Sequence, residues 1–285
     1  MKIVQKPFKY AYKLLEGRGL SKISFVKSFY NYIYPKVIPE RIVLKEIQGN
    51  KMHLDLNDKI VSTKLFMNNI WEETETKLFK DMIQENMTVI DIGAHIGYYT
   101  LIAAKLIGKK GKVYSFEPNP DNFALLKKNI EENGYKNVTL INKAISNKKG
   151  FLKLFINPES SGGASIYEKE NAKYYTNIIA TTLDESLKNI KKIDIIKMDI
   201  EGAEILALEG MSNIIKRNKN IKLIIEFNPE GIKKLGYEPI NLINKLKNFG
   251  FTIKVIDEKN KSIIPVEYNN IIFNNKESIN LLCEK

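Results

Sequence analysis

The segment that most constrains the fold lies at residues 88–97, where a short apolar run leads into two glycines. The pattern predicts a buried strand over residues 89–92, a tight loop at Gly93 and Gly97, and a helix over residues 98–107. Glycines in such a loop let the backbone approach a ligand closely, because no Cβ intrudes. A strand, a glycine loop and a helix in this order open a nucleotide-binding half-sheet.

The glycine spacing bears on what this loop binds. It is Gly-x-x-x-Gly with Asp91 two places before the first glycine, and it lacks the Gly-x-Gly-x-x-Gly pattern that packs a pyrophosphate on a helix N-terminus. The Asp91 carboxylate would also repel a phosphate. S-adenosylmethionine, which carries an amino group and a positive sulfur, suits the loop better. A strand-to-helix turn without a ligand is the alternative.

Composition limits the class of protein. The chain has 285 residues, enough for one large α/β domain with an extension. No apolar run approaches the roughly 18 residues of a membrane span, and no secretory signal pattern stands at the N-terminus. The single cysteine, Cys283, leaves no internal disulfide and no cysteine metal cluster. These features predict a cytoplasmic protein.

The formal net charge of +12 suggests a nucleic-acid or membrane partner, but its source weakens that suggestion. Only Arg18, Arg41 and Arg217 are arginines, so nearly all the positive charge is lysine. Arginine is the residue favoured for planar phosphate and base contacts. We interpret the charge as a solvated surface and favour no nucleic-acid partner.

The N-terminal region differs in composition from the rest. Residues 1–40 are basic and aromatic and contain two potential amphipathic helices that end near Pro35 and Pro39. We favour a helical cap packed on the main domain. The alternative is peripheral contact with the inner membrane face or with a lipid-linked substrate. Residues 41–56 predict a β-hairpin, so we expect an extension over residues 1–60 and the main domain over residues 61–285.

Strands and helices alternate through the main domain, which predicts an α/β, doubly wound, mostly parallel sheet of seven strands. Residues 150–182 interrupt the alternation with two strands and a loop at 160–163. This segment is a candidate lid over the substrate that accepts the transferred group. The expected strands are residues 89–92, 112–117, 138–142, 193–199, 221–227, 251–256 and 271–273. The expected helices are residues 72–86, 120–133, 201–216 and 239–249.

Polar residues recur at the ends of the predicted strands, where an open α/β sheet binds its ligand. Glu117 lies 26 residues after Asp91 and can accept both hydroxyls of a ribose, and Asn142 can contact the edge of a purine. The fourth and fifth predicted strand ends carry Asp199, Glu201, Glu204, Glu226 and Asn228. Five such ends in register are hard to explain as solvated termini.

Four blocks of the chain resemble FkbM-type S-adenosylmethionine-dependent methyltransferases, over about residues 60–230. They are Asp91-Ile-Gly-Ala-His-Ile-Gly-Tyr-Tyr-Thr100, Phe116-Glu-Pro-Asn-Pro120, Thr182-Leu-Asp-Glu-Ser186 and Lys197-Met-Asp-Ile-Glu-Gly-Ala-Glu204. The resemblance implies a class I methyltransferase (Rossmann-like) fold and methylation of a hydroxyl on a sugar or glycan, a glycolipid or a related product. Glu226-Phe-Asn-Pro229 departs from the histidine expected there in many relatives.

The resemblance also implies which residues bind the cofactor. Asp91, Gly93 and Gly97 would hold the methionine portion, Glu117 the ribose, and Asn142 and Ala144 the adenine. For the aromatic and apolar members, core packing is the alternative. The full expected set is Asp91, Gly93, His95, Gly97, Tyr98, Thr100, Glu117, Pro118, Asn119, Asn142, Ala144 and Asp199.

An aliphatic hydroxyl is a poor nucleophile, so a base that takes its proton assists methyl transfer. Asp199, beside the expected methyl position, is the first candidate for that base, and Glu201 and His95 follow. Compensation of a helix dipole is the alternative for Glu201, and orienting the loop is the alternative for His95. No metal is favoured; Mg²⁺ held by Asp199, Glu226 and Asn228 is the alternative.

Two other classes of function compete with methylation of a glycan or small-molecule hydroxyl. An RNA or protein methyltransferase fits the charge, but no catalytic cysteine pair or RNA-binding module is present. A binding protein that keeps the fold without turnover would be free to lose Asp91, Glu117 and Asp199, and all three are intact. A dehydrogenase is the weakest alternative, because the dinucleotide fingerprint is missing. The acceptor and the oligomeric state stay open.

Overall fold

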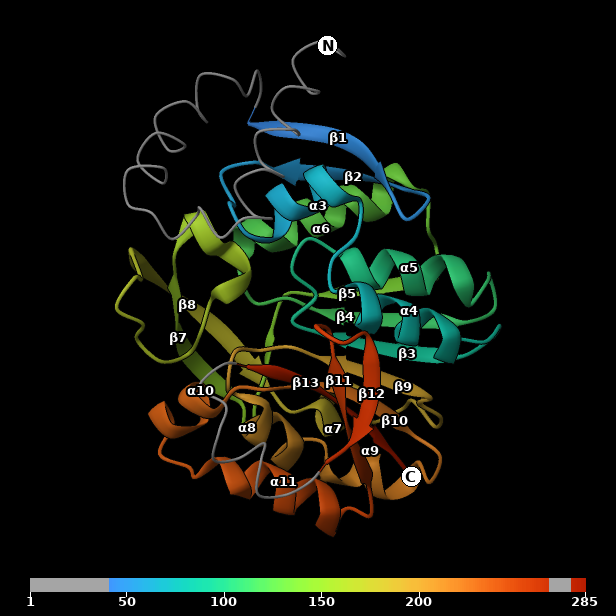
Figure 1. Cartoon of the computed structure of the whole chain (residues 1–285), viewed down its shortest axis with the longest axis vertical. Helices are drawn as coiled ribbons and strands as arrows, with labels where there is room; N and C mark the ends of the chain where they lie inside the picture. The colour runs from blue at the N-terminus through green and yellow to red at the C-terminus, as the bar shows by residue number, and fades with distance from the viewer. Residues whose placement is uncertain (1–40, 267–277) are drawn as a thin grey trace.

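The computed structural model describes residues 41–266 and 278–285 (Figure 1). The hypotheses about residues 1–40 and the strand expected at 271–273 lie outside the described residues. Within the described ranges, no helix is both long and apolar enough to cross a membrane.

A mainly parallel sheet forms the centre of the molecule and confirms the expected class I methyltransferase architecture. Five strands run parallel in the order β5, β4, β3, β9 and β10. The antiparallel strand β13 lies between β10 and β11, and β12 pairs with the outer edge of β11. The bounds are β3 Thr88–Ile92, β4 Lys112–Phe116, β5 Val138–Ile141, β9 Ile195–Met198, β10 Lys222–Phe227, β11 Thr252–Asp257, β12 Ser262–Pro265 and β13 Ile279–Glu284.

The expected count of seven strands is wrong for the described residues, whose main sheet has eight. Six of the expected strands are present, the seventh lies outside the described residues, and two strands that were not expected come from the C-terminal part of the chain. Residues 262–265 form a short edge strand, and residues 279–284 form the antiparallel strand that is buried between two neighbours.

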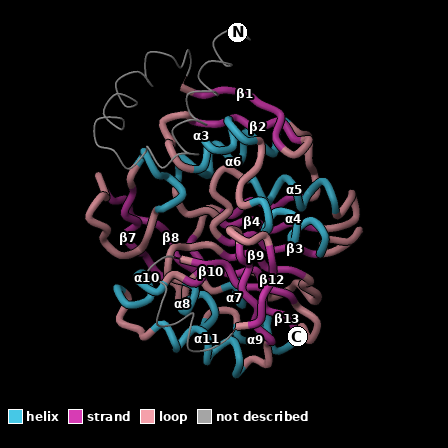
Figure 2. The backbone as a smooth tube through the Cα atoms, viewed as in Figure 1, coloured by secondary structure: helices cyan, strands magenta, loops and turns pink. Residues whose placement is uncertain are grey.

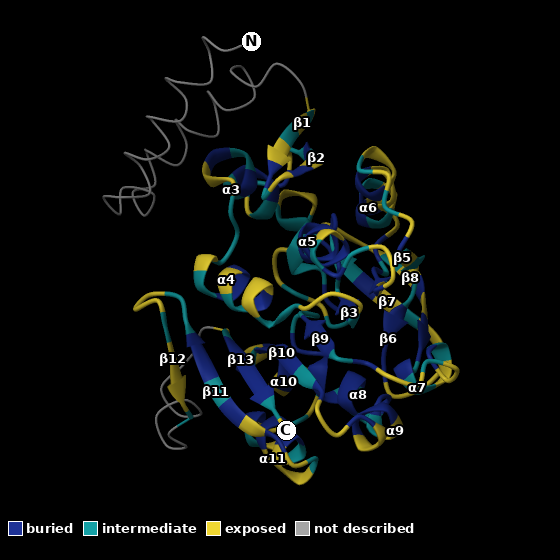
Figure 3. Cartoon of the chain, turned by 90° about the vertical axis from the view of Figure 1, so that its right-hand side faces the viewer, coloured by how far each residue is buried: buried dark blue, intermediate teal, exposed yellow. Residues whose placement is uncertain are grey.

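Helices cover both faces of this sheet, as Figures 1 and 2 show. On one face lie α4 (Glu73–Met82), α5 (Tyr98–Leu106) and α6 (Pro120–Glu132). On the other lie α8 (Glu204–Glu209), α9 (Ser212–Arg217), α10 (Pro229–Lys234) and α11 (Pro239–Asn248). The central strands are buried on both sides (Figure 3), which explains their continuous apolar sequences.

The predicted hairpin is confirmed as β1 (Ile42–Ile47) and β2 (Asn50–Asp55). The hairpin packs on the helices that cover one face of the sheet. Asn129 of α6 accepts a hydrogen bond from the His53 amide at 2.6 Å and donates one to the His53 carbonyl at 3.3 Å. The short helix α3 (Val61–Asn68) follows the hairpin. The domain boundary at residue 60 stays a prediction.

The single helix expected over residues 201–216 is wrong. The chain forms α8 and α9 with a break at Gly210 and Met211. A Cβ on Gly210 would lie 2.0 Å from the carbonyl oxygen of Ser146, so the segment packs directly against the backbone of another element. Hydrophobic periodicity, on which the prediction rested, does not register such a contact.

The interrupting segment forms a separate small sheet in the order β6, β8, β7 beside the main one. Its strands are β6 (Ala144–Ile145), β7 (Gly150–Ile156) and β8 (Tyr174–Thr181). The loop expected at 160–163 is part of a short 3₁₀ helix, η2 (Pro158–Gly163), and a four-residue helix, α7 (Leu183–Ser186), follows β8.

The strand order reverses direction between β3 and β9. From β3 the chain adds β4 and then β5 on one side, and β9 and β10 lie on the other. Ligands of open α/β sheets bind outside the carboxyl ends of the strands at such a switch point. The Asp91–Gly93 loop and Asp199 leave the sheet there.

Candidate functional site

The loop after β3 is held by buried polar contacts. Thr100 donates a hydrogen bond to Asp91 Oδ2 at 2.6 Å and lies 2.8 Å from the Ser115 hydroxyl. Burial raises the pKa of Asp91 to about 6, although the Thr100 hydrogen bond opposes the shift. Gly93 has φ +82°, and a Cβ there would lie 2.0 Å from the Asp199 carbonyl oxygen, so only glycine lets this loop lie against the end of β9.

Glu117 is fixed by two backbone amides at the end of β4. Asn119 N–H donates to its Oε1 and His95 N–H to its Oε2, each at 2.8 Å. The side chain is buried, and burial raises its pKa to about 7 against the effect of these bonds. The carboxyl group is therefore pre-positioned at the mouth of the sheet.

His95 lies in the left-handed backbone region, at φ +50°. Its Nε2 is 2.7 Å from the Ser161 hydroxyl of η2 and 3.8 Å from Asp58 Oδ2. Burial lowers the pKa of His95, although the charges of Asp58 and Asp199 oppose the shift. A neutral imidazole in this position ties η2 to the loop.

Two adjoining cavities open at the switch point. We call the first, which encloses about 610 Å³ including open solvent, the apolar chamber and the second, about 800 Å³ on the same measure, the acidic chamber. Gly93, His95, Gly162 and Asp199 line both. The apolar chamber is also lined by Phe116, Glu117, Pro118, Ala144, Ile145 and Leu154, and the acidic chamber by Trp71, Asp91, Tyr98, Tyr99, Lys197 and Glu201.

Lys197 is a functional candidate that the sequence analysis did not assign. It is 1% exposed inside β9, with Nζ 3.2 Å from Glu75 Oε1 and 3.6 Å from Asp199 Oδ2. Burial acts to lower the pKa of Lys197, but the charges of Glu75 and Asp199 outweigh burial and raise it. A lysine within an otherwise apolar strand was the available signal.

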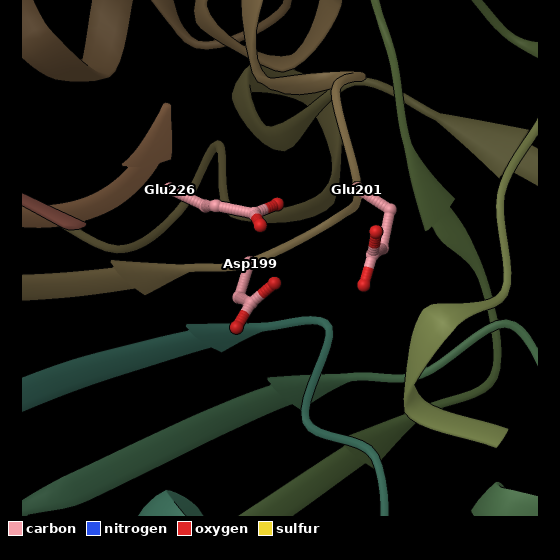
Figure 4. A group of neighbouring side chains, drawn as sticks. All are labelled: Asp199, Glu201 and Glu226. Carbon is pink, nitrogen blue, oxygen red and sulfur yellow. The ribbon is translucent and has the colours of Figure 1, made fainter. Parts of the chain in front are cut away.

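Carboxylates gather where β9 and β10 end. One oxygen each of Asp199, Glu201 and Glu226 lies within 4.8 Å of the others (Figure 4). Burial raises the pKa values of Glu201 and Glu226, and repulsion from Asp199 adds to both shifts. Lys169 Nζ contacts Glu201 Oε2 at 2.7 Å.

This group differs from the metal-ligand set considered from the sequence, which was Asp199, Glu226 and Asn228. Asn228 Oδ1 accepts the Gly231 amide at 2.9 Å and caps α10, and Asn228 Nδ2 lies 3.5 Å from Glu201 Oε2. Glu201 takes its place beside Asp199 and Glu226. Its left-handed backbone, at φ +58°, could not be foreseen from the sequence.

The structure does not bring every expected cofactor residue to the chambers. The expected residues that line them are Asp91, Gly93, His95, Tyr98, Glu117, Pro118, Ala144 and Asp199. Thr100 lies beneath Asp91, Gly97 begins α5, and Asn119 caps α6 through a hydrogen bond from the Asp121 amide. Asn142 Nδ2 donates to the Glu117 and Pro118 carbonyls at 2.7 and 3.3 Å, which holds the loop after β4.

The segment η2 covers both chambers. Ser161 and Gly162 line the apolar chamber, and Ser160, Gly162 and Gly163 line the acidic one. Asn122 Nδ2 donates to the Ser161 carbonyl at 3.3 Å. The candidate lid therefore contacts the region expected for cofactor as well as the region expected for acceptor.

Comparison with known proteins identifies relatives of this chain. A family model, the methyltransferase FkbM domain, matches residues 91–253, more than half of the chain. Hexuronic acid methyltransferase AglP of Haloferax volcanii is 27% identical over 145 residues, which cover 51% of this chain and 58% of AglP. A protein-L-isoaspartate O-methyltransferase of Methanococcoides burtonii is 42% identical over 59 residues, covering 21% of this chain and 29% of that protein.

The match to AglP thus spans little more than half of that protein, and the other match spans less. Among solved structures, methyltransferase FkbM from Methylobacillus flagellatus KT aligns with a TM-score of 0.45 and 16% identity, over 70% of this chain and 44% of that one.

Proposed function

Because the chain belongs to the FkbM methyltransferase domain family, we propose that it is an S-adenosylmethionine-dependent O-methyltransferase acting on a hydroxyl of a sugar, a glycolipid or a related small molecule. The observation that carries the proposal is the junction of the two chambers at Gly93 and His95. An apolar chamber with one buried carboxyl group there meets a chamber rich in carboxylates.

The residues of both chambers fit the parts of the cofactor. Glu117 accepts the ribose hydroxyls, and Phe116, Ala144 and Ile145 provide apolar walls for the adenine. Asp91 attracts the amino group of the methionine portion, through the loop held by Thr100. S-adenosylmethionine, when bound, supplies a methyl group on a positively charged sulfur.

Asp199 is our candidate for the general base. It lines both chambers and is therefore placed where the methyl group and the acceptor meet. The acceptor oxygen forms a bond to the methyl carbon while the carbon–sulfur bond breaks and leaves its electron pair on sulfur; Asp199 takes the hydroxyl proton. Lys169 contacts Glu201 at 2.7 Å, closer than the 3.6 Å between Lys197 and Asp199, and Ser161 contacts His95, so Glu201 and His95 are better suited to positioning.

A sugar acceptor is supported by AglP, whose name describes a hexuronic acid methyltransferase. The resemblance to protein-L-isoaspartate O-methyltransferases is limited to 59 residues, 21% of this chain. A protein acceptor therefore has the narrower support. Contact of residues 1–40 with a membrane or with a lipid-linked substrate stays a hypothesis.

Transfer of an isotopically labelled methyl group tests this function. The full chain is incubated with labelled S-adenosylmethionine and, separately, uronic-acid oligosaccharides, neutral oligosaccharides, isoaspartyl peptide and RNA. We expect label in a saccharide, and a loss in kcat of about 10²–10⁴-fold for Asp199→Asn, the range typical of a general base.

The matched control is Glu131→Gln, which changes an exposed carboxylate of α6. It is expected to retain wild-type kcat. Label found only in RNA or peptide would replace the proposed acceptor class. Equal kcat in Asp199→Asn and wild type would remove Asp199 as the base.

A further inference from the structure

Three carboxylates, two from the loop after β9 and one from β10, converge at the edge of the acidic chamber. Asp199 follows β9, Glu201 lies in the turn before α8, and Glu226 belongs to β10. One oxygen from each lies within 4.8 Å of the other two, and Figure 4 shows the three groups around a common space. Like charges this close repel one another unless a cation lies between them or one of the carboxyl groups holds a proton.

Glu226 supplies a second and independent observation. Its side chain is 8% exposed, and its Oε2 is buried without a hydrogen-bond partner. A buried carboxylate oxygen without a donor is costly, and such groups in proteins are normally paired or coordinate a metal. The neighbours toward which this carboxylate points, Asp199 and Glu201, are acceptors themselves.

No lysine among the described residues forms an ion pair with Glu226. Lys169 pairs with Glu201 Oε2 at 2.7 Å, and Lys197 is shared between Glu75 and Asp199 at 3.2 and 3.6 Å. Within residues 41–266 and 278–285, the ion pairs of this cluster end on Glu201 and Asp199, and none ends on Glu226. Glu226 has a side-chain hydrogen bond with Ser278 but no cationic partner among the described residues, and a bound cation would supply that charge at Oε2.

We propose that Asp199, Glu201 and Glu226 form a binding site for a divalent cation of the hard, oxygen-preferring class (Mg²⁺, Mn²⁺ or Ca²⁺). Carboxylate oxygens are the ligands these ions select. Opposite ligands of Ca²⁺ lie about 4.6–5.2 Å apart, and those of Mg²⁺ about 4.0–4.2 Å. The three oxygens lie within 4.8 Å of one another, which is inside the limit set by opposite ligands of Ca²⁺.

Lys169 does not block such a site. It contacts Oε2 of Glu201, and a carboxylate has a second oxygen that can bind the cation. Each of the three residues needs to contribute only one ligand atom, so water or an acceptor oxygen completes the coordination shell.

The role of the cation, unlike its binding, rests on the proposed function. Asp199 and Glu201 line the acidic chamber, so a cation between them lies on the acceptor side of the cleft. There it would bind the acceptor hydroxyl and stabilise the oxygen as it loses its proton. Asp199 keeps one oxygen for that proton when it binds the cation through the other.

Binding of Mn²⁺ to the full chain, followed by electron paramagnetic resonance and calorimetry, tests the site without any methyl transfer. We expect one Mn²⁺ per chain, displaced by excess Mg²⁺ or Ca²⁺. Glu226→Gln preserves side-chain size but removes the charge, and is expected to weaken Mn²⁺ binding about 10–100-fold. Glu131→Gln, on the exposed face of α6, is expected to bind like wild type.

Binding of S-adenosylhomocysteine to each variant serves as the check on folding and separates the two proposals. A chain that binds S-adenosylhomocysteine but no Mn²⁺ overturns the cation site and leaves the proposed function standing. Equal Mn²⁺ affinity in Glu226→Gln and wild type also overturns it. Mn²⁺ binding that depends on Glu226, in a chain that fails to bind S-adenosylhomocysteine, supports the site and contradicts the proposed function.

Discussion

Glu117 is a buried carboxyl group that connects two loops of the fold and also lines the apolar chamber. Its oxygens accept two backbone amides, from His95 in the loop after β3 and from Asn119 at the start of α6. The group therefore connects two loops that border the apolar chamber. Burial nevertheless disfavours its charged form, and the pKa is raised to about 7.

This shift predicts a pH-dependent contribution to stability. The folded chain holds a proton on Glu117 up to about pH 7, whereas the unfolded chain releases it near the usual value of 4.5. Stability from this group is therefore fully present below pH 4.5 and is lost as pH rises through 7. The loss amounts to about 2–3 kcal/mol between pH 5 and 8.

Glu117→Gln removes the titration. Urea unfolding of variant and wild type at pH 5 and pH 8 measures it, and the stability of the variant relative to wild type is expected to increase by about 2–3 kcal/mol at the higher pH. Glu131→Gln, which changes an exposed carboxylate, is the control. A relative stability of Glu117→Gln that is the same at both pH values would contradict the account.

Residue types at strand ends predicted several side chains of the cleft correctly. Asp91, Glu117 and Asp199 line it, because parallel strands deliver their carboxyl ends to one edge of the sheet. Orientation was less predictable. Asn142 follows the third strand as expected, but its amide serves the backbone of the neighbouring loop. Glu226 approaches Asp199 and Glu201 through side-chain directions that no local pattern encodes.

At the scale of elements, Gly210 lies between α8 and α9 and lets this segment pack against the backbone of Ser146, the residue after β6. A Cβ at this position would lie 2.0 Å from the Ser146 carbonyl oxygen. Backbone atoms cannot yield as a flexible side chain can, so Gly210→Ala is expected to destabilise the fold by about 1–3 kcal/mol or more.

Thermal and urea unfolding of Gly210→Ala measure this cost. Gly108→Ala is a useful comparison, because no atom lies within 4 Å of the Cβ position and only its positive φ of +71° opposes the substitution. That strain costs about 1–2 kcal/mol. Destabilisation by Gly210→Ala that is smaller than that by Gly108→Ala would show that the contact yields easily.

Elements with a strong local pattern were predicted well. The α6 helix begins at Pro120 after the Asn119 cap and is followed by Gly134 at φ +67°, as its sequence signals indicate. Short elements were missed, among them α10 and the edge strand β12, because six or four residues contain too little periodicity. The break at Gly210 arises from a contact with Ser146, 64 residues away in the chain.

At the scale of the whole molecule, an acidic cleft stands in a strongly basic chain. The formal net charge is +12, yet Asp91, Asp199 and Glu201 line one chamber together. Surface charges are screened over about 8 Å at physiological salt, so the cleft carboxylates dominate for a ligand inside it. A cationic cofactor is therefore compatible with the basic surface.

Calorimetric titration with S-adenosylhomocysteine tests the central claim, that the two chambers hold the cofactor, most directly. We predict one binding site in the wild-type chain, weakened about 10–100-fold by Glu117→Ala and by Asp91→Ala, as expected when hydrogen bonds to charged groups are lost. Glu131→Gln is expected to bind like wild type. A well-folded wild-type chain that does not bind, or binding unaffected by either substitution, would contradict the account.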